Sequence, residues 1–153
     1  MASNGRGVKI GLQILLSIII VALAYLLYRS ITDPWEKVEL EKQLTEETRA
    51  RMGLVRTAMI QYDGVNDRFT SDLDSLVMFL KTDERQVSGR DSIYGAGFNP
   101  DELPFSPRTG NRFILAVNDT ARVPTYLLTD PDSKDRIGTL TGDVTQLNAS
   151  SWE

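Results

Sequence analysis

The pattern of hydrophobic and polar positions begins with a long stretch that carries no charge. Residues 10–28 (IGLQILLSIIIVALAYLLY) are 19 consecutive uncharged positions, and besides two tyrosines their only polar side chains are Gln13 and Ser17. A helix of this length spans about 29 Å, close to the ~30 Å hydrocarbon core of a bilayer. This pattern therefore predicts a transmembrane helix over residues 10–28.

Aromatic side chains at the end of this run favour a membrane anchor. Tyr25 and Tyr28 lie where an interfacial aromatic belt is expected, and Trp35 follows just outside the span. The side chains expected to contact lipid or its interface are Ile10, Leu16, Ile20, Leu27, Tyr28 and Trp35.

Two other interpretations of the run fit its sequence less well. A buried core helix usually keeps a polar face, which is missing here. A cleaved signal peptide would use Arg6 and Lys9 as its basic start and the segment ALA at 22–24 as its cleavage site, but the apolar run continues past that site to Tyr28. We therefore expect the span to stay uncleaved. Lipoprotein-type lipidation is excluded because the chain contains no cysteine.

The orientation of the span is predicted from its layout, because the charges that flank it are nearly balanced. Two basic residues precede the run, and three follow it within residues 29–42. A short tail before a single span and a long domain after it are typical of a signal anchor. We therefore expect an inner (cell) membrane protein with one span, a cytoplasmic N-terminus and a C-terminal domain in the periplasm or outside the cell.

A second helix is predicted directly after the span. Asp33 suits the N-cap, Pro34 the first helical position and Glu36 the third, as in a capping box. Because proline disfavours helical geometry in the residue before it, we expect a kink or a short break near residues 30–33.

One face of this helix is formed by residues that recur every three or four positions until Asp63-Gly64, which suits a helix end. They are Leu40, Leu44, Thr48, Met52, Val55, Met59 and Tyr62. The first half is highly charged and is expected to project as a stalk, whereas the second half is apolar enough to pack into a domain. On the stalk, the stripe of Val38, Leu40 and Leu44 is either a short coiled-coil seam or a solvated face, and the sequence leaves both open.

A short second helix is predicted over about residues 71–81, with a serine as its N-cap. Its apolar face consists of Leu73, Leu76, Val77 and Leu80. We expect Leu76 and Leu80 to be core residues that hold this helix against the long one near Val55 and Met59.

The next part of the chain predicts the first strands of a small sheet. Residues 82–111 are rich in Gly and Pro and are expected to form a loop whose only element is a short strand at 92–94. Residues 112–117 and 123–128 then form two strands, joined by a turn at 118–120.

Two further features refine the predicted sheet. Pro124 implies that the second strand lies at an edge there or starts late. Residues 136–140 and 143–147 are expected to form another short hairpin around Thr141-Gly142.

Together these elements predict an α+β fold with an N-terminal transmembrane helix, a long amphipathic helix, a short second helix and a small antiparallel β-sheet. The expected organisation is a cytoplasmic tail (1–9), a transmembrane helix (10–28), a juxtamembrane linker and helical stalk (29–50) and a periplasmic α+β domain (51–153).

The order of elements and one local segment resemble the pilins and pseudopilins. From Val55 to Leu80, a helix end (VRTAMIQY) is followed by a glycine-containing turn, by Phe69-Thr70 and by an L-x-x-L pair at Leu73 and Leu76. The F-T-x-x-x-D-x-L segment is also similar to a group of uncharacterised single-span envelope proteins of Bacteroidota. The resemblance implies a pilin-like domain, and major pseudopilins bind calcium in their C-terminal loops.

The resemblance does not extend to the prepilin peptidase site. The family has a glycine, then a hydrophobic residue, and then a glutamate at the fifth position of the mature helix. Counted from Gly7 that position is Leu12, and counted from Gly11 it is Leu16. Assembly into a pilin-type filament is therefore not expected, and the resemblance concerns the form of the domain rather than its function.

Composition and charge narrow the possible chemistry. The chain contains neither histidine nor cysteine, which excludes disulfides, Cys/His zinc sites, iron–sulfur clusters and Ser-His-Asp triads. Its net charge is −4, and the part after the span has 15 basic and 21 acidic residues, a net charge of −6. Such a charge argues against binding to nucleic acid or to anionic lipid headgroups.

Acidic clusters are the candidate sites. Asp130, Asp132 and Asp135 lie in D-P-D-S-K-D, which has Lys134 where a calcium loop would place a third ligand and lacks a glycine. They are therefore weak calcium candidates. The remaining acidic cluster is more simply explained by helix caps and Asx-turns. It consists of Asp63, Asp67, Asp72 and Asp74.

We therefore expect a non-enzymatic, single-pass, membrane-anchored envelope protein that is a subunit or scaffold of a larger membrane or secretion-type assembly. Its partners would be the lipid bilayer and other membrane or envelope proteins, met through residues 112–128 or 82–111, with no nucleic acid, small-molecule substrate or cofactor. The alternatives are a pseudopilin-like component of a type II secretion or type IV filament system, and a calcium-dependent periplasmic domain. Trp152 is either a docking residue or packed on its own sheet.

Overall fold

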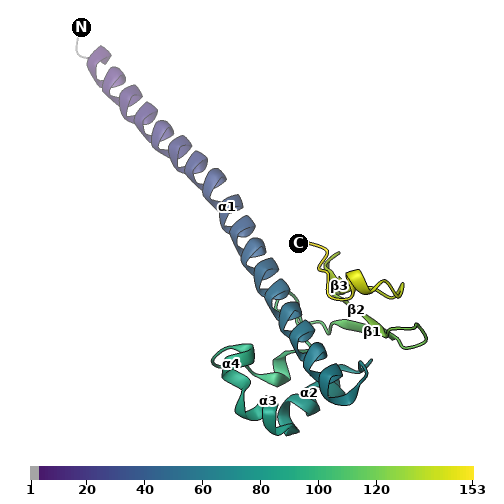
Figure 1. Ribbon diagram of the computed structural model, residues 1–153. Helices are drawn as coiled ribbons and strands as arrows, with labels where there is room; N and C mark the ends of the chain where they lie inside the picture. The colour runs from purple at the N-terminus through teal and green to yellow at the C-terminus, as the bar shows by residue number, and fades with distance from the viewer. Residues whose placement is uncertain (1–3) are drawn as a thin grey trace. The chain divides into compact units, whose positions relative to one another are not determined.

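The computed structural model describes the backbone of residues 4–153 and the side chains of residues 7–30 and 35–153 (Figure 1). By its internal contacts the chain divides into two compact units, residues 1–43 and residues 44–153. The long helix α1 (Asn4–Asn66) runs through the first unit and ends in the second. The fold is α+β, as predicted, with a long N-terminal apolar helix, short helices and a three-stranded antiparallel sheet.

Helix α1 is continuous where the sequence predicts a break. Its 63 residues include 30–33 and Pro34, so the expected separation into two helices is wrong. A proline inside a helix costs about 3 kcal/mol, but it biases the preceding residue rather than forbidding a helix there. The Leu, Ala, Glu and Lys residues on both sides favour the helical conformation. The N-cap role predicted for Asp33 concerns a side chain that lies outside the described residues.

The C-terminal end of α1 lies beyond the predicted stop at Gly64. The helix extends to Asn66, and Asp67 then adopts a positive φ of 54°. The backbone N–H of Asp67 donates to the carbonyl of Asp63 over 2.8 Å and closes the last turn. Aspartate is one of the few residues that tolerate this left-handed conformation, so it takes the position predicted for the glycine.

Helix α2 (Leu73–Thr82) follows the prediction with a shift of one residue at its start. The N-cap is Asp72 rather than Ser71, and its carboxylate accepts from the backbone N–H groups of Asp74 and Ser75. Aspartate is an efficient N-cap because it satisfies donors that no helical carbonyl can reach. The buried face contains Leu73, Leu76, Phe79 and Leu80.

The segment expected to be a loop contains three short helical elements. They are α3 (Glu84–Ser88), α4 (Arg90–Tyr94) and the 3₁₀ helix η1 (Pro100–Glu102). The strand predicted at 92–94 is wrong, because these residues belong to α4. The Tyr94 hydroxyl donates to Gln86 Oε1 of α3 over 2.7 Å inside the domain, and Tyr94 is buried in the core. A helix of five residues is too short to be recognised by its periodicity.

The sheet contains β1 (Ile114–Asn118), β2 (Thr125–Thr129) and β3 (Arg136–Gly138), in the order β1-β2-β3. All pairs are antiparallel, with Ala116 opposite Leu127 and Leu128 opposite Ile137. The two predicted strands at 112–128 are confirmed, and β2 starts directly after Pro124, as one of the two readings of that proline requires.

The second predicted hairpin is only partly right: its first strand, at 136–140, is present as β3, but its second strand, at 143–147, is wrong. Residues 143–147 contain the 3₁₀ helix η2 (Val144–Gln146), and the outer edge of β3 is instead covered by a later segment. Ile137 forms a bridge with Ser150, and the Gly138 N–H donates to the Ala149 carbonyl over 2.9 Å. Gly138 has a φ of 86°, and a Cβ there would lie 2.2 Å from the carbonyl oxygen of Tyr126, so only glycine fits.

One hydrophobic core joins the C-terminal part of α1, the short helices and the sheet. Leu76, Leu80, Val55 and Met59 are all buried in it, as predicted. Additional core residues are Met52, Ala58, Tyr94, Leu103, Phe113, Tyr126, Leu128 and Ile137. This core fixes the second unit as a domain with an interior of its own.

Candidate functional site

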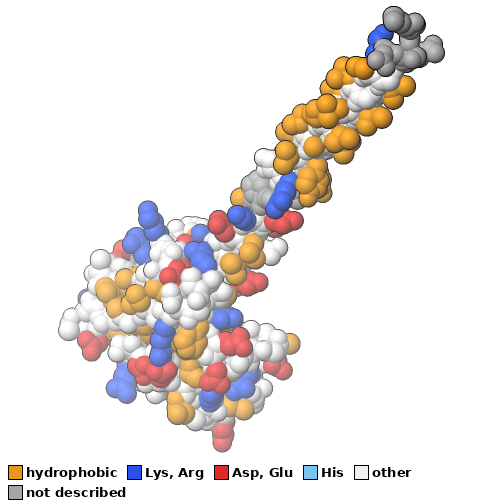
Figure 2. All heavy atoms as spheres, turned by 180° about the vertical axis from the view of Figure 1, so that it is seen from behind, with side chains coloured by type: hydrophobic (Ala, Val, Ile, Leu, Met, Phe, Trp, Pro, Cys, Tyr) orange, Lys and Arg blue, Asp and Glu red, His pale blue; other side chains and the backbone are white. Residues whose placement is uncertain are grey.

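The predicted anchor is an exposed apolar surface in the first unit. The six predicted anchor side chains, Ile10, Leu16, Ile20, Leu27, Tyr28 and Trp35, are between 55% and 71% exposed. Figure 2 shows hydrophobic side chains gathered over this stretch of the chain. No part of the most apolar stretch of the described helix is buried in the protein. This finding contradicts the interpretation of residues 10–28 as a buried core helix. By length and composition this helix can cross a membrane, as an anchor or a signal sequence would.

The stalk stripe remains exposed as well. Val38 and Leu40 are more than half exposed, and Leu44 is half-buried at the start of the second unit. In a single chain, both of the sequence-based alternatives for this stripe remain possible, since a coiled-coil seam would be exposed until a second helix covers it.

The three calcium candidates have three different environments. Asp135 forms a two-point ion pair with Arg49, whose Nε and Nη2 lie 2.9 Å and 3.1 Å from the two carboxylate oxygens. Asp132 accepts hydrogen bonds from the Thr109 hydroxyl and from Asn111 Nδ2, the latter over 3.0 Å. Among the described residues, no group of three or more acidic side chains is placed to hold a metal ion.

Asp130 differs from its two neighbours. Its side chain is 1% exposed, and neither carboxylate oxygen has a hydrogen-bond partner within the described part of the chain. A buried carboxylate without a partner is costly, because its lost hydration is not replaced. The D-P-D-S-K-D segment therefore contains one orphaned buried group rather than a cluster of converging oxygens.

The Arg49–Asp135 pair is a feature that the sequence did not reveal. The hydrogen bond to Asp135 raises the pKa of Arg49. The same guanidinium lies 5.3 Å from the centre of the Trp152 ring, within cation–π range. Trp152 is half-buried and packs against the core, so in this chain it follows the packing alternative. The two partners of Arg49 lie far away in sequence, and no local signal marks them.

Among the acidic residues around the loop between α1 and α2, Asp72 is the N-cap of α2. The pKa of Asp72 is lowered, first by the Ser75 hydroxyl and then by the backbone N–H groups it accepts from. The pKa of Asp63 is raised by partial burial and by the nearby charge of Asp67. Asp74 pairs with Arg112 over 2.5 Å and so joins the start of α2 to the segment before β1.

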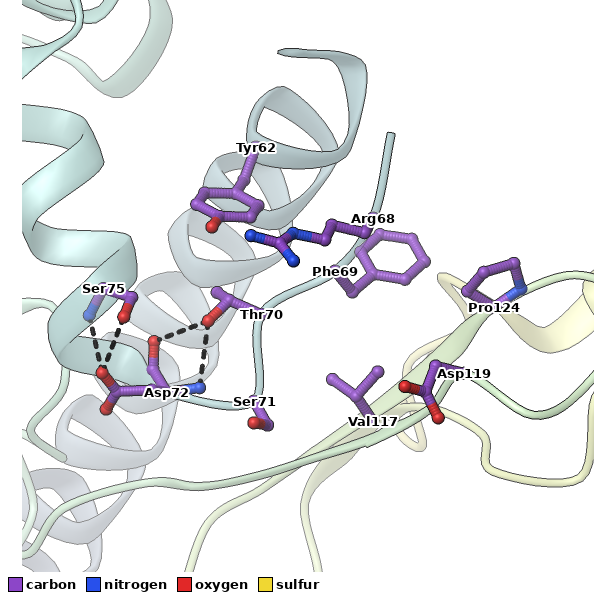
Figure 3. A pocket seen from close by; sticks show the side chains of 10 residues that line it. All are labelled: Tyr62, Arg68, Phe69, Thr70, Ser71, Asp72, Ser75, Val117, Asp119 and Pro124. Carbon is purple, nitrogen blue, oxygen red and sulfur yellow. Dashed lines mark hydrogen bonds between the residues drawn. The ribbon is translucent and has the colours of Figure 1, made fainter. Parts of the chain in front are cut away.

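An open pocket of about 450 Å³ lies between the loop after α1 and the end of β1 (Figure 3). We refer to it as the β1 pocket, and it is lined by Tyr62, Arg68, Phe69, Thr70, Ser71, Asp72, Ser75, Val117, Asp119 and Pro124. In Figure 3, Asp72 and Ser75 lie at the left, and Val117, Asp119 and Pro124 lie at the right. Its volume falls within the about 300–1,000 Å³ of typical ligand sites.

The walls of the β1 pocket are held in place by contacts to the rest of the domain. The Phe69 ring packs on Tyr126 of β2, with ring centres 5.0 Å apart. Thr70 Oγ1 accepts from the Asp72 N–H over 3.1 Å and shapes the turn into α2. Arg68 is exposed at the rim, and no hydrogen bond or ion pair joins it to another described residue. The pocket thus offers hydroxyls, a guanidinium, the carboxylates of Asp72 and Asp119, and apolar side chains such as Phe69 and Val117.

Sequence reasoning singled out Phe69 and Thr70 only through the pilin resemblance, and it missed Arg68 and Val117 as neighbours. The signal that was available is the Phe-Thr-Ser-Asp segment before an N-cap, which indicates a turn at a fixed place. The position of β1 beside the β1 pocket depends on the tertiary fold.

Comparisons with protein-family models, with curated proteins and with solved structures find no match for this chain. The chain is therefore described by its architecture, a membrane-capable N-terminal helix followed by a small three-stranded α+β domain. A pilin-like arrangement is consistent with that order of elements.

Proposed function

We propose that this chain is a non-enzymatic, single-pass membrane protein of the cell envelope whose second unit is an interaction module. It would serve as a subunit or scaffold of a larger membrane or secretion-type assembly. The observation that carries the proposal is the uncharged, exposed helical stretch over residues 10–28, joined to a domain with its own core. In this proposal the N-terminus is cytoplasmic and the domain lies in the periplasm or outside the cell.

The composition of the domain supports recognition over catalysis. The part of the chain after the span has a net charge of −6, and the chain offers neither histidine nor cysteine as a base or nucleophile. The Ser75 hydroxyl donates to Asp72 over 2.8 Å, but that carboxylate also accepts two backbone N–H groups as a helix cap. These groups are used for structure, and the surface that remains suits a protein partner.

The test of the anchor uses the full chain in its native membranes. Alkaline carbonate extraction should leave the protein in the membrane pellet at its full length. A reporter that is active only in the cytoplasm, fused after Glu153, should be inactive, whereas one that is active only outside should work. A soluble, shortened product would show that residues 10–28 are a cleaved signal, and an active cytoplasmic reporter would reverse the orientation.

The interaction role is tested by purification in mild detergent after cross-linking in cells. We expect a membrane or envelope protein to be cross-linked to residues of the second unit, located by mass spectrometry of the linked peptides. Cross-links confined to residues 10–28 would place the contact in the membrane and contradict the role of the domain.

A pseudopilin-like component of a secretion or filament system is the second candidate. The observation in its favour is the order of elements, a long apolar N-terminal helix followed by a small antiparallel sheet. Helical packing of α1 in a filament would produce cross-links between copies along residues 10–28. Absence of the protein from purified envelope filaments, together with an unprocessed N-terminus, would exclude a pseudopilin-like role.

A further inference from the structure

Strand β1 lies at the edge of the sheet, so one side of its backbone is available for pairing. The strand order β1-β2-β3 gives β1 a single partner. The other edge of the sheet is different, because β3 is covered by residues 149–151 through the Ile137–Ser150 bridge. Only the β1 edge of this sheet therefore lacks such cover among the described residues.

The direction of the unpaired groups follows from the residues just before β1. Phe105 and Arg112 form an antiparallel bridge, in which the Phe113 N–H donates to the Pro104 carbonyl over 2.8 Å. The backbone groups of Phe113 therefore point away from β2. Because these directions alternate along a strand, the N–H and C=O groups of Leu115 and Val117 point the same way.

The outward groups of Leu115 and Val117 have no partner. Within the described part of the chain, neither residue makes a backbone hydrogen bond outside the β1–β2 ladder. The segment around Phe105 pairs with this edge at Arg112 and does not continue along β1. The backbone donors and acceptors of Leu115 and Val117 therefore lie beyond the end of that pairing. The edge is thus already in a geometry that accepts an antiparallel strand.

The β1 edge also lacks the features that usually protect an exposed strand. Its sequence, ILAVN, has no charged residue, no proline and no glycine. Natural proteins commonly place lysine, proline or a bulge on such an edge to prevent unwanted pairing. Ile114, at the start of the strand, is 56% exposed. An unprotected edge of this kind is consistent with use as a binding surface.

The β1 pocket adjoins this edge and supplies side-chain contacts. Val117 lines the pocket together with Ser71 and Ser75 (Figure 3). Arg68 at the rim has five donors and no partner among the described residues, which suits a carboxylate. A strand that pairs with β1 would therefore pass its side chains along the pocket and bring one of them near Arg68.

We propose that the free edge of β1 and the β1 pocket bind an extended segment of a partner protein, which adds to the sheet as an antiparallel fourth strand and places an acidic side chain against Arg68. This inference rests on the proposed role of the domain as an interaction module and names its surface. The Leu115 and Val117 backbone groups provide the hydrogen bonds, and the pocket and Arg68 select the side chains.

The probe is a displayed library of random 12-residue peptides, selected against the full chain in lipid nanodiscs. We expect the selected peptides to alternate apolar and polar residues and to contain an acidic residue. Binding should slow amide hydrogen exchange at Leu115 and Val117 specifically. Ile114, Ala116 and Asn118, whose N–H groups face β2, should be protected before the peptide is added.

Two variants with matched controls test the contacts. Val117→Pro removes one outward N–H, and we expect binding to weaken about tenfold, the factor for one or two net hydrogen bonds. Its control is Val144→Pro, an exposed valine at the first position of η2, where proline is tolerated. Arg68→Glu should weaken the binding of the acidic peptides by a similar factor. Arg85→Glu, which changes an arginine outside the pocket, should leave their binding unchanged.

Several outcomes would overturn the inference. They are the absence of any selected peptide, unchanged exchange at Leu115 and Val117, and equal binding to wild type and Arg68→Glu. Self-association of the full chain that Val117→Pro abolishes would also overturn it, since the occupant would then be a second copy. If Val117→Pro fails to fold, the inference is still tested by the hydrogen-exchange data and by the comparison of Arg68→Glu with Arg85→Glu. None of these results bears on carbonate extraction or reporter activity, which test the anchor separately.

Discussion

Helix α1 belongs to two regions in which apolar side chains have opposite exposure. In the first unit, Leu16 and Ile20 are more than half exposed, whereas in the second unit Val55 and Met59 are completely buried. Both stretches are rich in apolar residues, so hydrophobicity alone does not separate them. What differs is the pattern: residues 10–28 are apolar on every side of the helix, and residues 44–66 are apolar on one face.

This difference determines which solvent each region requires. A helix that is apolar all round has no face to present to water, so it needs lipid or protein around it. A one-faced helix needs only a core, and α2 and the sheet supply it. The periodicity of each region therefore indicates its environment. Substitutions in residues 10–28 should change membrane insertion, and substitutions in the core should change the stability of the domain.

The largest effect is expected in the core. Leu76→Ala should lower the free energy of unfolding by about 2–5 kcal/mol, because Leu76 is fully buried and the vacated space cannot be refilled. The measurement is urea denaturation of the full chain in detergent. Val38→Ala, on the exposed stalk stripe, is the control and should change this value by less than about 0.5 kcal/mol. Equal effects would remove the distinction between the two regions.

The next effect concerns the first unit and a different assay. Ile20→Arg places a charge in the middle of the apolar run, which costs about 2.5–3.5 kcal/mol for insertion. We expect more of this variant than of Ile20→Ala in the carbonate-soluble fraction. The urea midpoint of the second unit should stay unchanged in both variants. A large loss of domain stability would mean that residue 20 is buried in protein rather than in lipid.

A smaller effect is expected at the Arg49–Asp135 pair. Arg49→Ala leaves a nearly buried carboxylate without its two hydrogen bonds and removes the cation from the Trp152 ring, so stability should fall by about 1–3 kcal/mol. Trp152 fluorescence is expected to change in the same variant. Lys81→Ala, whose ion pair with Asp101 lies between two exposed side chains, should have a weaker effect. The opposite ranking would contradict the role of Arg49.

The pH dependence of the α2 cap is expected to be smaller still. Because the pKa of Asp72 is lowered in the folded state, its contribution to stability is present above the ordinary aspartate pKa of about 3.9 and is lost as the pH falls through the lowered value. The difference in melting temperature between wild type and Asp72→Asn should therefore shrink below about pH 4. A difference that grows on acidification would reverse the assigned direction.

Chelation is expected to have the smallest effect. Asp132 and Asp135 are engaged by protein groups, so addition of EDTA should leave the melting temperature of the second unit unchanged. A lower melting temperature in EDTA, restored by calcium and absent in Asp130→Asn, would show that a cation occupies the orphaned Asp130 carboxylate. That result would revive the weakest of the sequence-based candidates.

The parts of the fold that the sequence predicts are those with a strong local period. The uncharged run at 10–28, the face containing Leu76 and Leu80, and the strands on both sides of the 118–120 turn all have such a signal. Two of the wrong predictions fall where two local rules compete. Asp67 rather than Gly64 ends α1, and Pro34 lies inside the helix it was expected to start.

The candidate site was less accessible from the sequence. The free edge of β1 depends on strand order, and the covering of the other edge depends on residues 149–151 at the C-terminal end of the chain. The Arg49–Asp135 pair joins positions 86 residues apart. No periodicity or motif carries information over that separation, because the contacts form only after the core has brought the segments together.

The covering of β3 by residues 149–151 has a consequence for the order of events during synthesis. Arg56 contacts the Asn148 carbonyl, the Ser150 hydroxyl and Glu153, so α1 gains partners that are made about 90 residues later. At about 5–20 residues per second, the apolar run leaves the ribosome several seconds before those partners exist. If the chain is anchored in the proposed orientation, its domain would still be unfinished when the N-terminal helix reaches the membrane, and an unfinished chain is the form in which a domain is most easily carried across one.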